Sequence, residues 1–139
     1  MKKILIAAHG KFAEGIRSSA EIILGKQENL YTINAYLDET PVKQQLDEFF
    51  KGADLEKDTL LVITDVFGGS VNQAIISNYQ KDNIKVITGV NLPLLLELIM
   101  LDEEDVTDDK IRSIVNKARE QVILVNDALS KATGDDFDF

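Results

Sequence analysis

Short apolar runs rich in β-branched residues alternate along the chain with longer segments in which apolar residues recur at helical spacing. The short runs predict four strands, which cover residues 4–7, 29–36, 59–65 and 84–89. The longer segments predict amphipathic helices. Alternation of strands and helices is typical of a parallel sheet with helices on both faces. We therefore predict an α/β fold with an open, flavodoxin-like sheet whose strands lie in the order 2-1-3-4.

Residues at the ends of the predicted helices indicate where each helix begins or stops. Gly25 is expected to end the first helix, and Pro41 is expected as the first residue of the second. Four residues are predicted as N-caps, because their side-chain oxygens can accept hydrogen bonds from first-turn N–H groups: Thr40, Ser70, Asn91 and Thr107. Ser70 also forms a capping-box pattern with Gln73. The apolar face of the first helix is predicted to comprise Ala13, Ile16, Ala20, Ile23 and Leu24.

The end of the chain leaves two interpretations open. Residues 122–125 are consecutive apolar residues rich in β-branched side chains, which favours a fifth strand over a continuation of the preceding helix. The competing interpretation is a helix packed against its own subunit. We predict that residues 1–129 form one domain and that residues 130–139, which are acidic, form a disordered tail.

Composition excludes several classes of function for a protein with this fold. The chain has 139 residues, 45% of them hydrophobic, which suits a single domain with one core. It contains no cysteine, which excludes disulfides and thiolate metal sites. The formal net charge of -9 would repel nucleic acid and anionic lipid. The apolar run before His9 is too short for a signal peptide or a membrane span, so we expect a soluble, cytoplasmic protein with no nucleic-acid partner.

The single histidine of the chain, His9, follows the first predicted strand, and Asp65 ends the third. In a sheet of order 2-1-3-4 these strands are neighbours, about 4.8 Å apart. Sites of open α/β sheets form at the carboxyl edge, where the strand order reverses. We therefore predict a hydrogen bond from one ring nitrogen of His9 to Asp65, which leaves the other nitrogen free to act as a nucleophile.

A glycine-rich turn follows Asp65 and supplies a candidate phosphate site. Gly68, Gly69 and Ser70 stand at the predicted start of a helix, where backbone N–H groups and the helix dipole favour an anion. Taken alone, the turn could simply join a strand to a helix, and a lone histidine is often only a surface residue. Because both features converge on one edge of the sheet, the sequence favours attack of His9 on a phosphoryl group.

The chain contains, in this order, the stretches ILIAAHG, VITDVFGGSVNQA and VITGVNLPLLLE. They resemble the IIA domain of the mannose-type (mannose/fructose/sorbose) bacterial phosphotransferase system, and the resemblance covers about residues 2–127. It implies that His9 accepts a phosphoryl group from the carrier HPr and passes it to a IIB component on a separate chain for sugar uptake. Asp65 matches the aspartate beside that histidine, and Ser70 matches the serine of the phosphate site. Val71 stands where the family usually has proline.

The resemblance also bears on assembly and cofactors. Mannose-type IIA proteins exchange an antiparallel C-terminal strand between two subunits, which implies a homodimer here with a swapped fifth strand. Such a strand would close the free edge beyond strand four. The implied mechanism needs no metal and no cofactor, and contact with the membrane is expected only indirectly, through the transporter complex.

Three other functions remain open. A response-regulator receiver would use Asp65 as phosphoacceptor, but it needs acidic residues after the first strand, where Ala7, Ala8 and His9 stand. The phosphoryl-donor subunit of a dihydroxyacetone kinase also carries a histidine there, although its glycine turn differs. The third alternative is a non-catalytic flavodoxin-like binding module. Phosphoryl transfer to His9 would separate the carrier functions from the binding module.

Overall fold

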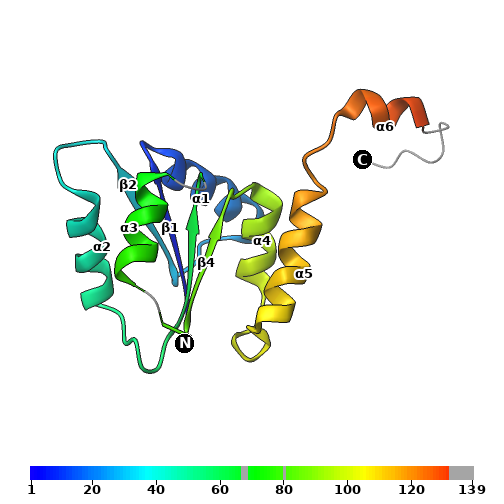
Figure 1. The fold of residues 1–139 in the computed structure, drawn as a ribbon. Coiled ribbons are helices and arrows are strands. Elements are labelled where there is room, and N and C mark those ends of the chain that lie inside the picture. Colours follow the sequence, from blue (N-terminus) through cyan, green and yellow to red (C-terminus); the bar gives the residue numbers. More distant parts are fainter. Residues whose placement is uncertain (67–68, 80, 132–139) are drawn as a thin grey trace.

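A computed structural model describes residues 1–66, 69–79 and 81–131 of the chain. Within these residues, four parallel strands form one sheet in the order β2-β1-β3-β4 (Figure 1). β1 spans Lys2–His9, β2 Leu30–Ala35, β3 Thr59–Thr64 and β4 Ile84–Thr88. This order confirms the predicted open, flavodoxin-like sheet, and it places β1 beside β3 at the centre.

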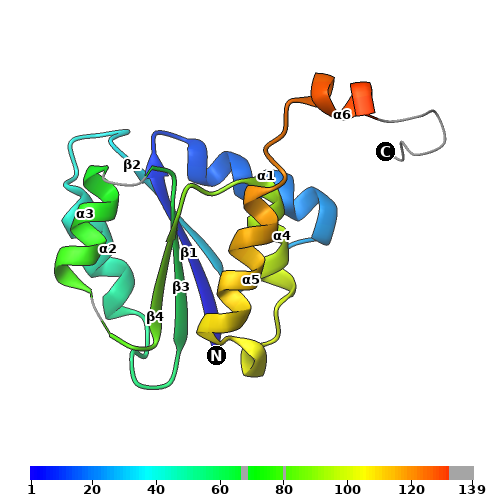
Figure 2. The same cartoon turned by 45° about the vertical axis from the view of Figure 1, so that its right-hand side comes forward.

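Helices cover both faces of the sheet (Figure 2). The helices on one face are α1 (Phe12–Leu24), α4 (Leu92–Met100) and α5 (Asp108–Arg119), and those on the other are α2 (Val42–Lys51) and α3 (Ser70–Asn78). A short 3-10 helix at Glu103–Asp105 lies between α4 and α5. In the described part of the chain, no helix is both long enough and apolar enough to cross a membrane.

Side chains of the central strands alternate between two buried clusters, one on each face of the sheet. In β1, Ile4 and Ile6 pack on the side of α1, α4 and α5, whereas Leu5 packs on the side of α2 and α3. This is the period of two that a strand requires. Residues 60–63 of β3 alternate in the same way and are at most 1% exposed. Because both faces of the sheet are covered, its strand ends are left to form a site.

Several predicted helix boundaries are confirmed. Asn91 caps α4 by accepting from the Leu94 N–H, and Thr107 caps α5 by accepting from the Lys110 N–H. Gly25 ends α1 with a φ of 82°, which favours glycine.

The predicted apolar face of α1 is partly wrong. Ala13 and Ala20 are buried, and Ile16 packs against their cluster, but Ile23 is 57% exposed. Small side chains form the contact of α1 with the sheet, so the buried stripe is narrower than predicted.

Thr40 and Ser70 are not N-caps, contrary to the prediction. The N-cap of α2 is Pro41 and that of α3 is Gly69, and neither helix has a side-chain cap. The backbone N–H of Thr40 donates to Asp38 Oδ1 at 2.8 Å, which holds Thr40 in the preceding turn. Ser70 is the first residue of α3 rather than its cap, so the predicted capping box is absent. Its hydroxyl has a different partner, which belongs to the site.

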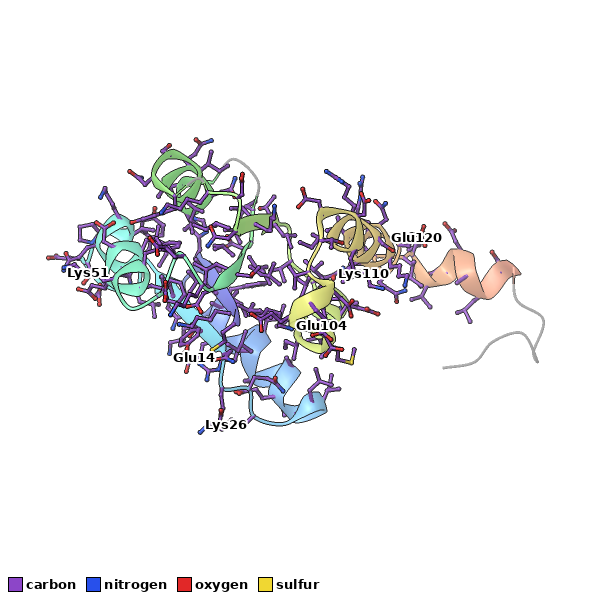
Figure 3. All side chains as sticks on the ribbon, turned by 90° about the horizontal axis from the view of Figure 1, so that it is seen from below. Glu14, Lys26, Lys51, Glu104, Lys110 and Glu120 are labelled. Carbon is purple, nitrogen blue, oxygen red and sulfur yellow. The ribbon has the colours of Figure 1, made fainter. Side chains whose placement is uncertain are left out.

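The predicted antiparallel fifth strand is not confirmed. Residues 122–124 have no regular secondary structure, and α6 occupies Val125–Lys131. Beyond Glu120, this segment extends away from the rest of the protein (Figure 3), so neither the strand nor the competing helix packed on its own subunit is present. A strand needs a neighbouring backbone to pair with, and within the described residues none lies alongside.

We call residues 122–131 the C-terminal arm. Its large apolar side chains are between 45% and 78% exposed: Val122, Ile123, Leu124, Val125 and Leu129. Residues 132–139 of the predicted acidic tail lie outside the described part of the chain.

Candidate functional site

His9 and Asp65 lie together at the carboxyl edge of the sheet. His9 is the last residue of β1, and Asp65 directly follows β3, the neighbouring strand. His9 Nδ1 lies 2.8 Å from Asp65 Oδ2, and the His9 backbone N–H donates to the same oxygen at 3.0 Å. The hydrogen bond expected from the strand order is therefore present, and a backbone bond further fixes the carboxylate.

The surroundings of Asp65 keep its carboxyl group ionised. Its side chain is only 14% exposed. Burial by itself raises the pKa of this carboxyl group, but the hydrogen bonds from the His9 backbone and ring outweigh burial and lower the pKa of Asp65 below its ordinary value. An ionised carboxylate can only accept hydrogen bonds, so His9 Nδ1 carries the ring proton. In the neutral form of the ring, the other nitrogen, Nε2, therefore presents a lone pair.

The imidazole ring lies beside the start of α3. A Cβ atom placed on Gly69 would lie 3.5 Å from His9 Cε1, the ring carbon between Nδ1 and Nε2. Ser70 follows as the first residue of α3. The first N–H groups of a helix have no partner within the helix, and they carry its positive dipole end. Gly69 and Ser70 thus lie where the phosphate site was predicted, whereas Gly68 lies outside the described residues.

Tyr36 belongs to the site although the sequence analysis did not single it out. Its ring stacks on the His9 imidazole, with centroids 5.2 Å apart, and its hydroxyl donates to Ser70 Oγ at 2.5 Å. The signal that could have found it is position. Tyr36 is the last residue of the strand predicted at 29–36, so it reaches the same carboxyl edge as His9.

Buried polar groups fasten the start of α3 to the sheet. Thr64 Oγ1 lies 3.2 Å from Asn72 Oδ1 and 2.7 Å from Thr88 Oγ1. The amide oxygen can only accept and the Thr64 hydroxyl has one proton, so Thr64 donates to Asn72 and accepts from Thr88. Asn72 is 2% exposed. This network lies on α3, β3 and β4, and it holds the first turn of α3 against the strand ends.

Val71 occupies the position where the family usually has proline. It is fully buried and lies in the same apolar cluster as Val62 and Ile75. Its side chain therefore anchors the first turn of α3 through packing.

Comparison with known proteins places the chain among proteins of the phosphotransferase system (PTS). Residues 3–115 match the family described as PTS system fructose IIA component. The PTS system mannose-specific EIIAB component of Escherichia coli (strain K12) is 34% identical over 124 residues, which cover 86% of this chain and 38% of that protein. The PTS system fructose-specific EIIA component of Bacillus subtilis (strain 168) is 25% identical over 134 residues, which cover 94% of this chain and 91% of that protein.

A solved structure gives the same assignment. A Klebsiella pneumoniae protein, described as a phosphoenolpyruvate-dependent sugar phosphotransferase system permease, is 33% identical, and the two structures agree with a TM-score of 0.85. The similarity covers 92% of this chain and 93% of that one.

Fold and site together define an α/β protein that presents one histidine, held by an aspartate, at the carboxyl edge of a flavodoxin-like sheet. With the match over residues 3–115, the chain belongs to the family of PTS fructose IIA components, the mannose-type IIA proteins. The chain spans 38% of the length of the E. coli relative, which is an EIIAB component.

Proposed function

We propose that the protein is a phosphoryl carrier of a sugar phosphotransferase system. His9 accepts a phosphoryl group from phosphorylated HPr and passes it to a IIB component on a separate chain. The observation that carries this proposal is the 2.8 Å contact between His9 Nδ1 and Asp65, which leaves Nε2 as the nucleophilic nitrogen. Membership of the IIA family supports the choice of a carrier over a receiver or a dihydroxyacetone kinase subunit.

The proposed transfer needs one bond to form and one to break. The Nε2 lone pair attacks phosphorus in line, the bond between phosphorus and its donor breaks, and the donor leaves with that electron pair. The backbone N–H groups at the start of α3 and the Ser70 hydroxyl bind the phosphoryl oxygens. Asp65 stabilises the imidazole as it becomes positive. Its negative charge also repels the phosphoryl group on the product, which favours delivery to the next carrier.

Exposed apolar side chains beside His9 support docking of protein partners at this edge. Phe12 begins α1 three residues after His9, Leu37 follows Tyr36, and Val66 follows Asp65; these three are 45%, 51% and 52% exposed. Patches of this kind mark interaction sites. We propose that residues 1–129 form the IIA domain and that the protein meets HPr and IIB in the cytoplasm, with the membrane involved only through the transporter.

Incubation with phosphorylated HPr tests the function directly. We expect one phosphoryl group per chain, mapped to His9 by mass spectrometry, and a label that is labile in acid and stable in alkali. A subsequent chase should move the label to a IIB protein and not to a dihydroxyacetone kinase. Absence of label, or a label on Ser70 or Asp65, would contradict the proposal.

Ser70→Ala is expected to slow transfer while leaving stability nearly unchanged. Because Ser70 is exposed and does not cap α3, the free energy of unfolding should change by less than about 0.5 kcal/mol. Loss of one donor to the phosphoryl group should slow transfer about threefold to tenfold. Ser77→Ala, also exposed on α3, is the matched control. Equal transfer rates for the two variants would restrict Ser70 to a structural role.

We also propose that the protein is a homodimer assembled through the C-terminal arm. A row of apolar side chains that are 45% to 78% exposed is unusual for a monomer. The strand order leaves the outer edge of β4 free in the described chain. Beside that edge, Ile87, Leu94 and Val115 line a groove that also includes Val122 at the base of the arm. A second copy that places its arm against this region would bury both apolar surfaces.

Sedimentation of three chains tests the dimer. The full chain is expected to sediment as a dimer at micromolar concentration, and a chain ending at Arg119, without the arm, as a monomer. A chain ending at Lys131 retains the arm and is the control, which should remain dimeric. A monomeric full chain, or a dimer that survives removal of the arm, would contradict the proposal.

A further inference from the structure

Tyr36 connects three elements of the site. It directly follows β2, whose last residue, Ala35, pairs with His9 of β1. The Tyr36 ring stacks on the imidazole with the two planes 27° apart. Its hydroxyl reaches Ser70, the first residue of α3. The tyrosine therefore covers one face of the imidazole, and its hydroxyl ends at the helix start beside which the ring lies.

Core packing does not explain the conformation of Tyr36. Its φ is 65°, in a region that residues with a side chain rarely adopt, and among the described residues no other non-glycine has a positive φ. The residue is nevertheless 53% exposed, so it gains little from burial. Strained backbone of this kind is concentrated at functional sites.

We propose that Tyr36 is a catalytic residue of the transfer, whose hydroxyl binds the phosphoryl group carried on His9. This inference rests on the proposed function. The covalent step is unchanged, because the bond that forms still joins Nε2 to phosphorus and the Tyr36 hydroxyl keeps its proton. In the unphosphorylated protein this proton is donated to Ser70 Oγ.

Arrival of the phosphoryl group changes what the two hydroxyls can bind. A group attached to Nε2 brings anionic oxygens to the start of α3, where the hydroxyls of Tyr36 and Ser70 already lie 2.5 Å apart. Each hydroxyl can then donate to a phosphoryl oxygen. The neutral hydrogen bond between Tyr36 and Ser70 is replaced by two hydrogen bonds to anionic oxygens. Each of these is about twice as strong as a neutral hydrogen bond. The gain exists only when the phosphoryl group is present, so it favours transfer rather than folding.

The stacked ring has a second, positioning effect. Asp65 fixes Nδ1 within the plane of the imidazole, and Tyr36 covers one face of that plane. Together they restrict rotation of the ring, so Nε2 stays in one position near the start of α3. Tyr36→Phe removes only the hydroxyl and keeps the ring, so it separates the two effects.

A merely structural role for the contact makes a different prediction from direct binding. If the Tyr36–Ser70 bond only joins the loop after β2 to α3, either Tyr36→Phe or Ser70→Ala abolishes it completely, and the double variant loses nothing more. If each hydroxyl binds the phosphoryl group, their losses multiply in the double variant. The control is Tyr79→Phe, which removes a hydroxyl that donates to Asp47 just beyond the other end of α3.

The experiment measures the rate of transfer from phosphorylated HPr for the wild type, the two single variants, the double variant and Tyr79→Phe. The phosphorus NMR shift of each phosphorylated protein is recorded as well. We expect Tyr36→Phe to slow transfer about tenfold, the double variant to be slower than either single variant by nearly the product of their effects, and the phosphorus shift to move with Tyr36→Phe but not with Tyr79→Phe.

Two results would overturn the inference while leaving the proposed function intact. One is a double variant no slower than the slower single variant, and the other is a Tyr36→Phe protein that matches Tyr79→Phe in rate and phosphorus shift. A wild-type protein that takes no label from phosphorylated HPr would instead overturn the proposed function, and this inference with it.

Discussion

Replacing His9 by alanine is expected to abolish labelling by phosphorylated HPr altogether. The chain contains 1 histidine, so no second imidazole can take over the role of nucleophile. The His9 side chain is 42% exposed, and the buried clusters on both faces of the sheet do not include it. The variant should therefore fold, and its thermal unfolding, followed by circular dichroism, should stay close to that of the wild type.

A second substitution at the same position separates chemistry from contact. His9→Gln keeps an N–H group that can donate to Asp65, but it has no nucleophilic nitrogen, so it too should take no label. Labelling is followed by mass spectrometry of the intact protein and of its peptides. Stoichiometric labelling of either variant would show that the phosphoryl group is carried elsewhere, and the assignment of His9 would be wrong.

The pairing of His9 with Asp65 could be predicted because parallel register leaves little freedom. Once apolar runs identify two strands as neighbours, the residues that follow them must lie within a few ångströms of each other. Here β1 and β3 pair from Lys2 with Thr59 to Ala7 with Thr64, so Asp65 and His9 follow the last pair by one and two residues at the same edge. Strand and helix alternation predicts a parallel sheet covered on both faces, but it is compatible with more than one strand order, so the order 2-1-3-4 depended on the choice of a flavodoxin-like sheet.

Tyr36 could not be assigned in this way, because its role depends on a backbone dihedral angle. A φ of 65° directs the ring across His9, and nothing in the residue type announces that conformation. The capping prediction for Ser70 failed for a related reason. Serine is a good N-cap, but in this turn Gly69 takes that place and the serine hydroxyl binds Tyr36. The preference of serine for N-cap positions indicated the right turn, but the N-cap of α3 is Gly69, one residue before Ser70.

The C-terminal arm shows a different limit. Its apolar, β-branched residues predict a strand, yet strand formation depends on a partner backbone that a single chain does not provide here. Helix α6, by contrast, forms local hydrogen bonds that need no second strand, such as those from the Asp127 and Ala128 N–H groups to the Leu124 carbonyl oxygen. Asp127 in its first turn also interacts favourably with the helix dipole. The apolar composition of the arm supports the proposed dimer, in which a second copy would bury it.

Asp65→Ala is expected to have the second-largest effect on transfer, after loss of His9. The carboxylate fixes the ring proton on Nδ1 and faces the positive charge that develops on the imidazole. Two unit charges about 4 Å apart interact by about 4 kcal/mol at an effective dielectric constant near 20. Because His9 is partly exposed, solvent reduces this interaction energy. A loss of about 3 kcal/mol of transition-state stabilisation corresponds to a transfer rate roughly a hundredfold lower.

Asp65→Asn distinguishes the charge of this residue from its shape. The amide can still contact Nδ1, but it is neutral and can donate as well as accept, so both ring tautomers become accessible. We expect Asp65→Asn to be slower than the wild type and faster than Asp65→Ala in the reaction with phosphorylated HPr. Both variants should keep the cooperative unfolding of the wild type, because Asp65 lies at the edge of the sheet and outside its two apolar clusters.

The pH dependence gives an independent check on Asp65. Because its pKa is lowered in the folded protein, the carboxylate stays charged throughout the neutral range. Any stability that it contributes is present above the pKa of the unfolded chain and is lost only as the pH falls through the lower, folded value. Protonation of Asp65 should therefore cause no change in the wild-type transfer rate between about pH 6 and 8. If Asp65→Ala matched the wild type in the rates of both half-reactions, acceptance from HPr and delivery to IIB, Asp65 would be only a loop carboxylate.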